Sequence, residues 1–205
     1  MIIRPANSED AESIWRVLEP VIRAGETYPL PRDMDRSEAL AYWLAPHHDV
    51  FVAADMTGSS RSESSDHSRK SPPPSRRKGE EELAAQGKDY SSAAEPELNQ
   101  AQKIVGTYYL RANNAGGGAH VCNCGYMVAA GATGRGVARA MCAHSLTRAK
   151  DRGFRAMQFN FVIATNERAV RLWQAMGFSI VGRLPGAFLH PTQGYVDALV
   201  MHREL

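Results

Sequence analysis

Apolar residues recur along this chain at two spacings, every second residue in some segments and every third or fourth in others. The short apolar segment Ile2–Arg4 predicts a first strand. After it, apolar positions at helical spacing run from a cap at Ser8 to a stop at Gly25. The apolar face of this first helix comprises Ile14, Trp15, Leu18 and Ile22.

A second helix is predicted between Asp35 and Pro46. Asp35 and Glu38 have the three-residue spacing of a capping box, in which each side chain accepts a hydrogen bond from the other residue's backbone N–H. Pro46 cannot continue a helix, so the helix is expected to end before it. The apolar run Val50–Met56 then predicts a strand.

The stretch from about Thr57 to Gln102 differs in composition from the segments on either side. Ser, Pro, Lys, Arg and Glu dominate it, and the run from Lys70 to Lys78 holds three consecutive prolines and a basic triplet. With almost no large apolar residue, the stretch cannot bury enough surface to offset the conformational entropy lost on ordering. We expect a single domain over residues 1–205, interrupted at 57–102 by a low-complexity, disordered insert. A docking segment that uses the prolines or the basic triplet is the alternative.

The strand and helix pattern resumes after the insert. Three apolar segments predict strands, the first of which is expected to pair with the strand before the insert: Ile104–Leu110, His120–Val128 and Arg155–Ile163. Two helices and two short final strands are also predicted: Gly136–Arg152, a helix from Thr165 or Asn166 to Gly177, Ser179–Gly182 and Tyr195–Arg203. This order predicts an α/β fold with a mixed central sheet and helices on both faces.

Composition and charge narrow the kinds of partner. The chain has 24 Lys and Arg against 22 Asp and Glu, a formal charge of +2, so nucleic acid is not expected as a partner. Three cysteines, an odd and low number, suit a reducing compartment better than a disulfide scaffold. The first residues lack the apolar core of a secretory signal, and no apolar run approaches the ~20 residues that span a bilayer. We expect a soluble, cytoplasmic protein with no membrane partner.

The segment Val128–Ala138 joins a predicted strand to a predicted helix and is crowded with Gly and Ala. Small residues let backbone N–H groups approach a bound anion closely, and the helix N-terminus adds partial positive charge at the same place. A pyrophosphate site is one interpretation, and a plain tight turn is the other.

Two segments resemble the signatures of the Gcn5-related N-acetyltransferase (GNAT) family. Thr133–Ala138 is similar to the family's phosphate loop, Gln/Arg-x-x-Gly-x-Gly/Ala, with Thr133 where Gln or Arg is usual. The segment from Asn166 to Gly177-Phe178 is similar to the second signature, an Asn followed by a helix that ends in Gly-Phe. The resemblance implies the GNAT fold, acetyl-CoA as co-substrate, no metal and these cofactor-binding residues: Val128, Thr133, Gly134, Arg135, Gly136, Val137, Ala138 and Asn166.

The family resemblance also implies where the chemistry takes place. Acetyl-CoA would lie where the strands His120–Val128 and Arg155–Ile163 splay apart, and a backbone N–H near Val128 would hold the thioester oxygen. The amine attacks directly, without an acyl-enzyme. Many members place a tyrosine acid four residues before the Gly of the Gly-Phe pair, but this chain has Trp173 there, and an indole N–H cannot act as that acid. Water or another group must then protonate the CoA thiolate, or the electrostatic field of the loop must stabilise it.

Asn160 is a lone amide in an otherwise apolar strand, and Asn123 lies between two cysteines in the neighbouring strand. Burying an amide without partners costs roughly 1–3 kcal/mol, so Asn160 needs backbone, water or substrate as a partner. A satisfied structural amide remains the alternative. The pattern of Asn160, Asn166 and Trp173 resembles the fungal L-azetidine-2-carboxylate and proline-analogue N-acetyltransferases. That resemblance implies that Asn123 and Asn160 are catalytic and hold the carboxylate and nitrogen of a small imino or amino acid, and that the Asn123 carbonyl polarises the nitrogen.

Five further residues are candidates for a site. Glu26 and Tyr28 lie between the first two helices, where GNAT proteins often line the acceptor site, so both are predicted to bind substrate; a solvated carboxylate and aromatic packing are the alternatives.

His120, Cys122 and Cys124 alternate and would share one strand face, but a structural zinc site needs four ligands and no fourth is evident. We expect packing there and no metal.

The predicted function is acetyl-CoA-dependent N-acetylation of a small amine, an amino or imino acid. Acetylation of a protein N-terminus, a lysine or a polyamine is a second hypothesis. A non-catalytic acetyl-CoA sensor or adaptor, with the insert as its docking arm, is a third. The resemblance also implies a possible homodimer.

Overall fold

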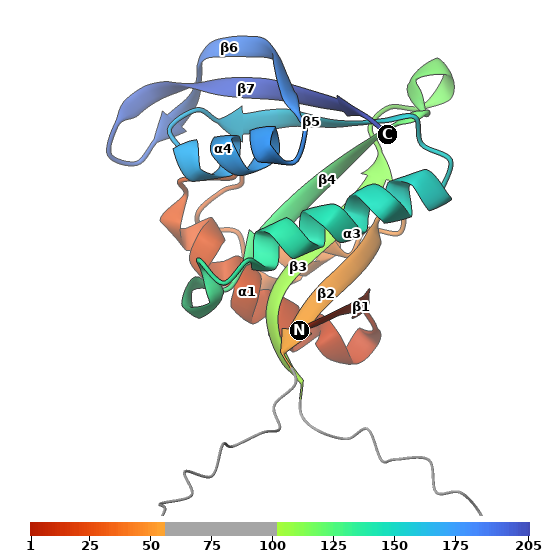
Figure 1. Ribbon diagram of the computed structural model, residues 1–205. Helices are drawn as coiled ribbons and strands as arrows, with labels where there is room; N and C mark the ends of the chain where they lie inside the picture. Colours follow the sequence, from red (N-terminus) through yellow and green to blue (C-terminus); the bar gives the residue numbers. More distant parts are fainter. Residues whose placement is uncertain (56–101) are drawn as a thin grey trace, which may run out of the picture. The chain divides into compact units, whose positions relative to one another are not determined.

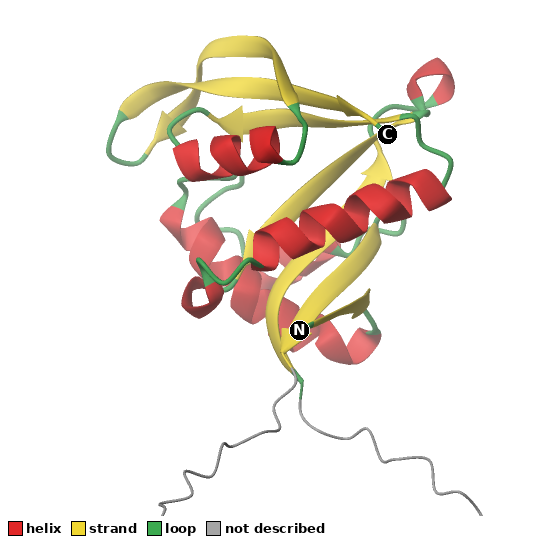
Figure 2. Cartoon of the chain, in the orientation of Figure 1, coloured by secondary structure: helices red, strands yellow, loops and turns green. Residues whose placement is uncertain are grey.

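Residues 1–55 and 102–205, which the computed structural model describes, form a seven-stranded mixed sheet with helices on both faces (Figure 1). The predicted insert lies outside these residues, except for Gln102. The strands are β1 (Ile2–Pro5), β2 (Asp49–Asp55), β3 (Lys103–Ala112), β4 (Val121–Val128), β5 (Ala156–Ile163), β6 (Ser179–His190) and β7 (Gly194–Glu204). The helices, coloured red in Figure 2, are α1 (Ala11–Ala24), α2 (Arg36–Trp43), α3 (Val137–Asp151) and α4 (Glu167–Ala175), with short 3-10 turns η1 (Ser8–Asp10), η2 (Gly116–Gly118) and η3 (Ala130–Ala132).

The strand order in the sheet is β1-β2-β3-β4-β5-β7-β6. Among these strands, only β4 and β5 run parallel, and every other neighbouring pair is antiparallel. The predicted mixed α/β sheet is therefore confirmed, as is the pairing of the strands on either side of the insert, β2 and β3. Within the described residues, no helix has the length and hydropathy needed to cross a membrane.

The first helix is preceded by a short 3-10 turn, and the α-helix itself begins only at Ala11. Asn7, not Ser8, is the cap: its side chain accepts a hydrogen bond from the Glu9 N–H at 3.0 Å, and the Asp10 carboxylate accepts one from the Asn7 N–H at 2.9 Å. This reciprocal pair closes a 3-10 turn over Ser8–Asp10 before α1 starts. The prediction of Ser8 as the cap is wrong because Ser8 is already the first residue of the turn that Asn7 caps.

The other predicted helix ends are confirmed. Asp35 and Glu38 form both bonds of the capping box, at 2.9 and 3.0 Å. Gly25 ends α1 at φ 64°, in the left-handed region that glycine adopts without strain. Asn166, rather than Thr165, caps α4, where its side-chain oxygen accepts from the Ala169 N–H at 3.2 Å.

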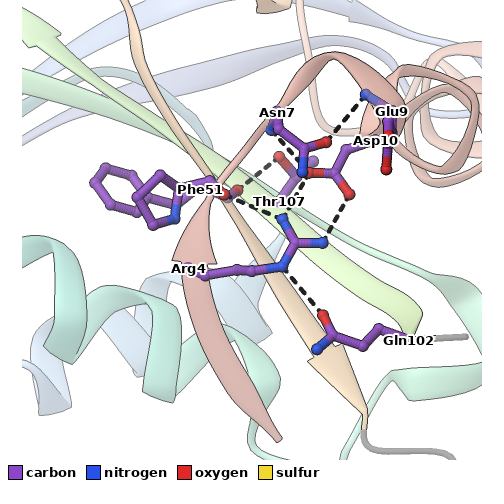
Figure 3. Close-up of polar contacts among 8 residues, drawn as sticks. Arg4, Asn7, Glu9, Asp10, Phe51, Gln102 and Thr107 are labelled. Carbon is purple, nitrogen blue, oxygen red and sulfur yellow. Dashed lines mark hydrogen bonds and ion pairs between the residues drawn. The ribbon is translucent and has the colours of Figure 1, made fainter. Parts of the chain in front are cut away.

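A polar cluster around Arg4 ties β1 to the start of α1 and to the start of β3 (Figure 3). The Arg4 guanidinium donates to both Asp10 carboxylate oxygens at 2.7 and 2.8 Å and to the Gln102 side-chain oxygen at 3.1 Å. The Asp10 side chain is buried, with 7% of its surface exposed. Such charge-assisted bonds anchor the edge strand at the point where the chain leaves and re-enters the sheet.

Two apolar cores cover the two faces of the sheet. On one face, α1 and α2 pack against β2, β3 and β4 through a cluster that includes Trp15, Leu18, Ile22, Trp43 and Tyr109. On the other, α3 and α4 pack through Val137, Met141, Met157, Phe159 and Trp173. Figure 1 shows α3 in front of β3 and β4 and α1 behind them. Alternate residues of β4 therefore face different helices, which decides what each of them can contact.

The last hairpin is much longer than predicted. The sequence predicts a strand only at Ser179–Gly182, but β6 continues to His190, with a bulge between Leu184 and Phe188. Asp197 of β7 holds this bulge by accepting from the Gly186 N–H at 2.9 Å and from Arg183 at 2.6 Å. Because β6 is an edge strand, it tolerates the proline and the exposed apolar residues that obscured its pattern.

Candidate active site

The parallel strands β4 and β5 separate soon after they begin. Their paired residues are only Val121 with Ala156 and Cys122 with Met157, after which β5 stays with β7 and β4 stays with β3. Figure 1 shows the two strands diverging on the side of α4. A cavity of about 840 Å³ occupies the gap, and its lining comes from both strands, α3, α4 and the α1–α2 connection. The splay that the GNAT resemblance implied is thus present in the structure.

The backbone of β4 directs toward this gap the hydrogen-bonding groups that do not pair with β3. The Ala129 N–H bonds the Val105 carbonyl of β3 at 2.9 Å, so the alternation of the ladder turns the backbone groups of Cys124, Tyr126 and Val128 away from β3. The Tyr28 hydroxyl donates to the Tyr126 carbonyl at 2.9 Å. The Val128 N–H thus faces the gap, whereas the Asn123 carbonyl lies on the β3 side and cannot polarise a nitrogen in the gap.

The loop after β4 and the first turn of α3 form one end of the cavity. Gly134 and Gly136 have φ values of 86° and 80°, which side-chain-bearing residues adopt only with strain. Within the described residues, no side chain caps α3, so its first N–H groups remain available together with the positive end of the helix dipole. The predicted residues that line the cavity here are Thr133, Gly134, Gly136, Val137 and Ala138. An anion fits such a cradle.

The arginines that line the cavity near this loop are not the one that the sequence predicts. The Arg135 side chain forms a 2.6 Å ion pair with Asp55 at the end of β2 and is absent from the cavity lining. Arg139 and Arg168 line the cavity instead. A Cβ atom at Gly134 would lie 3.8 Å from Nη2 of Arg168, so this cation is close to the loop. Neither was singled out in the sequence, although Arg139 lies one turn into the helix after the loop.

Asn123 and Asn160 both line the cavity, from the two strands that separate. Asn123 is buried, at 6% exposure, and its amide nitrogen donates to the Gln158 carbonyl oxygen at 2.8 Å. Asn160 is exposed, and it lies on the same side of β5 as Gln158, next to the register shift between Phe159 and Val162. The expectation that Asn160 is buried is therefore wrong.

The partners of Asn160 are side chains rather than backbone. Its amide oxygen accepts from Gln158 at 2.8 Å, and its amide nitrogen donates to the Asn113 side-chain oxygen at 2.6 Å. Asn113 follows β3 directly, where its N–H continues the ladder to the Val121 carbonyl at 2.8 Å. An amide cluster of Asn113, Gln158 and Asn160 therefore spans from β3 to β5.

The α1–α2 connection closes the opposite wall of the cavity. Glu26 and Tyr28 both line it, as predicted for an acceptor site, together with Tyr42 and Tyr109. Tyr109 lies over Gly125, where a Cβ atom would come within 2.6 Å of the tyrosine ring, so only glycine fits there. Burial raises the pKa of Tyr28 and of Tyr109 well above the usual range, so both phenols stay protonated near neutral pH.

Known proteins with related sequences and folds identify this arrangement. The profile of the Acetyltransferase (GNAT) family matches residues 61–178. A GCN5-related N-acetyltransferase from Kribbella flavida is 32% identical, with a TM-score of 0.75, over 100% of this chain and 97% of its own. The chain belongs to the GNAT family.

Two further GNAT proteins are similar to this chain. N-acetyltransferase aca1 of Schizosaccharomyces pombe is 28% identical over 180 residues, which are 87% of this chain and 72% of aca1. The structure of yncA, a putative acetyltransferase from Salmonella typhimurium with its cofactor acetyl-CoA, shares the fold at 15% identity and a TM-score of 0.69, over 100% of this chain and 94% of yncA. This GNAT protein is an acetyl-CoA-dependent N-acetyltransferase, so the non-catalytic sensor is set aside. None of these names specifies the acceptor amine.

At the position of the usual GNAT tyrosine acid, Trp173 is a packing residue. Its ring lies 5.0 Å from that of Tyr126 and 5.1 Å from that of Phe159, measured between centroids, and the side chain is buried while lining the cavity. Asn166 lines the same cavity from the start of α4. The nearest phenol, Tyr126, bonds Ser145 at 2.7 Å, and burial raises its pKa, so it is not poised to release a proton.

The cysteines of this GNAT protein lie in the core. Cys122 and Cys124 are buried against α3, and burial raises the pKa of Cys122 to about 12, which keeps it a thiol. His120 precedes β4, is exposed, and lies 3.1 Å from the Gly117 carbonyl oxygen. The three side chains thus do not share one strand face. In the part of the chain that the structure describes, no group of three or more His, Cys, Asp or Glu side chains has a metal-binding arrangement.

Proposed function

We propose that this GNAT enzyme acetylates the nitrogen of a small amino or imino acid by direct attack on the thioester of acetyl-CoA. The observation that carries the proposal is the pair Asn123 and Asn160. These amides come from the two strands that separate and line one cavity of about 840 Å³. A volume of this size suits the reacting end of acetyl-CoA together with a small acceptor.

On the cofactor side, the proposal assigns the phosphates to the loop Thr133–Ala138 and the first turn of α3. The positive-φ glycines, the free helix N–H groups and the nearby cations Arg139 and Arg168 support this assignment. The N–H of Val128 would stabilise the thioester oxygen as negative charge develops on it. Asn166, which both caps α4 and lines the cavity, would contact the cofactor from the other side.

On the acceptor side, Asn160 would orient the substrate through its exposed amide. Asn123 would keep β4 and β5 in position where they separate, through its hydrogen bond to the Gln158 carbonyl oxygen. The Cys124 carbonyl, which faces the gap, would accept the N–H of the attacking amine, the role that the resemblance had implied for Asn123. Glu26 is the sole carboxylate among the described residues that line the cavity, and it is exposed to solvent. It would take up the proton that a cationic amine must lose before it attacks.

The thiolate of CoA would be protonated by water rather than by a side chain. The usual tyrosine is replaced by Trp173, and the phenols that line the cavity bond other groups or are held protonated by burial. The cavity reaches solvent at several exposed residues, including Glu26 and Asn160, so water has access.

Acetylation of a polyamine or a protein amine is the weaker hypothesis. A polycationic acceptor favours a carboxylate-rich groove. The described cavity lining holds one carboxylate, Glu26, against three arginines, Arg111, Arg139 and Arg168. This charge balance repels polycations.

The experiment is turnover of a small imino acid, measured by release of free CoA thiol, in Asn160→Ala and in Asn114→Ala as a matched control. Asn114 is an exposed asparagine of the neighbouring turn and does not line the cavity. We expect kcat/KM for the imino acid to fall about tenfold or more in Asn160→Ala alone, as for loss of a hydrogen bond to a charged group. An unchanged kcat/KM in Asn160→Ala would remove Asn160 from the acceptor site.

A further inference from the structure

Arg111 is a cavity residue with a position that the sequence did not single out. It is the penultimate residue of β3, its Cα partner across the ladder is Asn123, and its side chain lines the cavity. Along β3, Arg111 alternates with Tyr109 and Asn113, so these side chains project from one face of the sheet. That face carries the acceptor wall.

Within residues 1–55 and 102–205, the Arg111 guanidinium has neither an ion-pair partner nor a hydrogen bond. Other arginines differ: Arg4 pairs with Asp10, Arg135 with Asp55 and Arg183 with Asp197, at 2.6 to 2.7 Å. Arg111 is half-buried. A partly desolvated cation without a counter-ion is unfavourable in the empty site, and an anion in the cavity would relieve it.

The charge of Arg111 acts on two neighbouring groups of the acceptor wall, Tyr109 and His48, and neither of them is acidic at neutral pH. Tyr109 stacks on His48 at 4.3 Å between ring centroids, and burial followed by nearby basic groups, Arg111 among them, lowers the pKa of His48. Burial raises the pKa of Tyr109, and the charge of Arg111 opposes that rise. The positive charge of Arg111 therefore acts on the acceptor wall.

One member of the amide cluster of Asn113, Gln158 and Asn160 shares the cavity lining with this cation, namely Asn160. Asn113 follows Arg111 by two residues, and Asn160 bonds Asn113 at 2.6 Å. A guanidinium offers two parallel donors that match the two oxygens of a carboxylate. The Asn160 amide donates one N–H to Asn113 and has a second N–H to offer. Arg111 and Asn160 together can hold a small carboxylate next to the gap between β4 and β5, where the amine would react.

We propose that Arg111 binds the carboxylate of the acceptor and so makes this enzyme selective for amines that carry an α-carboxylate. The inference rests on the proposed function, because it places that carboxylate in the same acceptor site. Arg111 would thereby determine which acceptor binds and would take no part in the acetyl transfer itself. It would hold the carboxylate of the acceptor while Asn160 orients the ring or chain that carries the nitrogen.

The test compares azetidine-2-carboxylate with azetidine-2-carboxamide, which share the ring nitrogen and differ in the charge of the substituent. Both are assayed by thiol release with wild type, Arg111→Gln and Arg111→Lys, and with Arg16→Gln as a control. Arg16 is an exposed α1 arginine outside the cavity. Because the amide also changes the basicity of the nitrogen, the decisive quantity is the ratio of the two kcat/KM values in each protein.

We expect Arg111→Gln to lower kcat/KM for the carboxylate about 10- to 100-fold, mainly through KM. The value for the carboxamide and the KM for acetyl-CoA should change less than about twofold. Arg111→Lys keeps the positive charge but loses the two parallel N–H donors of the guanidinium, so it should retain part of the selectivity. Arg16→Gln should match wild type, and equal melting temperatures of the variants establish that they are folded.

Each other outcome overturns the inference in a distinguishable way. If Arg111→Gln lowers turnover of both acceptors equally, Arg111 shapes the site but does not bind the carboxylate. If the ratio is the same in wild type and Arg111→Gln while both turn over, the proposed function stands and Arg111 has no part in selectivity. If wild type acetylates neither acceptor but does acetylate another class of amine, the proposed function fails and the Arg111 inference fails with it.

Discussion

The Asn123 amide bonds the Gln158 carbonyl oxygen at 2.8 Å at the point where β4 and β5 stop pairing. One side chain thus replaces the ladder bond that the diverging backbones no longer form. Since a buried carbonyl without a partner is unfavourable, this bond lets the strands separate at little cost in stability.

We predict that Asn123→Ala lowers both stability and turnover. The free energy of unfolding should fall by about 1 to 3 kcal/mol, because the substitution leaves the Gln158 carbonyl unsatisfied. Chemical denaturation measures this loss, and thiol release measures the accompanying fall in kcat. Normal stability combined with lost turnover would contradict the bridging role and favour direct contact with substrate.

A second prediction concerns the phosphate loop. Gly136→Ala places a side chain at φ 80°, where strain of about 1 to 2 kcal/mol opposes the native loop. No atom lies within 4 Å of the added Cβ, so the effect is conformational and not a clash. We expect KM for acetyl-CoA to rise about tenfold, with little change in KM for the acceptor.

The control for that loop variant is Gly117→Ala. Gly117 also has no atom within 4 Å of an added Cβ, but its φ is not positive and it lies in the β3–β4 turn. It should behave as wild type. Equal KM values for acetyl-CoA in both variants would show that the conformation of Gly136 does not matter for cofactor binding.

Trp173 provides a third prediction. Because the indole packs against Tyr126 and Phe159 and donates no proton, Trp173→Phe should keep the pH dependence of kcat. Stability should fall by about 1 to 3 kcal/mol from the smaller ring. A pH profile that loses its basic limb in Trp173→Phe would show that Trp173 assists proton transfer to the thiolate.

The Arg4–Asp10 pair predicts a pH-dependent part of the stability. Hydrogen bonds from Arg4 hold the pKa of Asp10 below its usual value, so the charged carboxylate favours the folded state. This contribution is fully present above the unfolded pKa of about 3.9 and is lost as pH falls through the lower folded value. The difference in unfolding free energy between wild type and Asp10→Asn should therefore shrink between pH 5 and pH 3. A difference that stays constant with pH would contradict the account.

Much of the fold was predictable because its signals are local. The capping box of Asp35 and Glu38, the left-handed Gly25 and the cap at Asn166 each depend on residues within one turn. The length of β6 was not predictable, since an edge strand with one exposed face and a bulge has no clear apolar period.

The site was predictable in outline but not in side-chain detail. The gap, the glycine loop and the presence of Asn123 and Asn160 in one cavity follow from the motifs and the strand order. The partner of Asn160 is Asn113, and the partner of Arg135 is Asp55, and both partners lie far away in sequence. Arg111 belongs to no motif, and only the pairing of β3 with β4 brings it beside Asn123.

The most direct test of the central claim is the acceptor selectivity of the wild-type enzyme. Thiol release from acetyl-CoA is measured against azetidine-2-carboxylate, proline analogues, common amino acids, polyamines and a peptide with a free N-terminus. The account predicts that kcat/KM is concentrated on the small imino and amino acids. Turnover concentrated on polyamines or the peptide, with the small acids inactive, would contradict it.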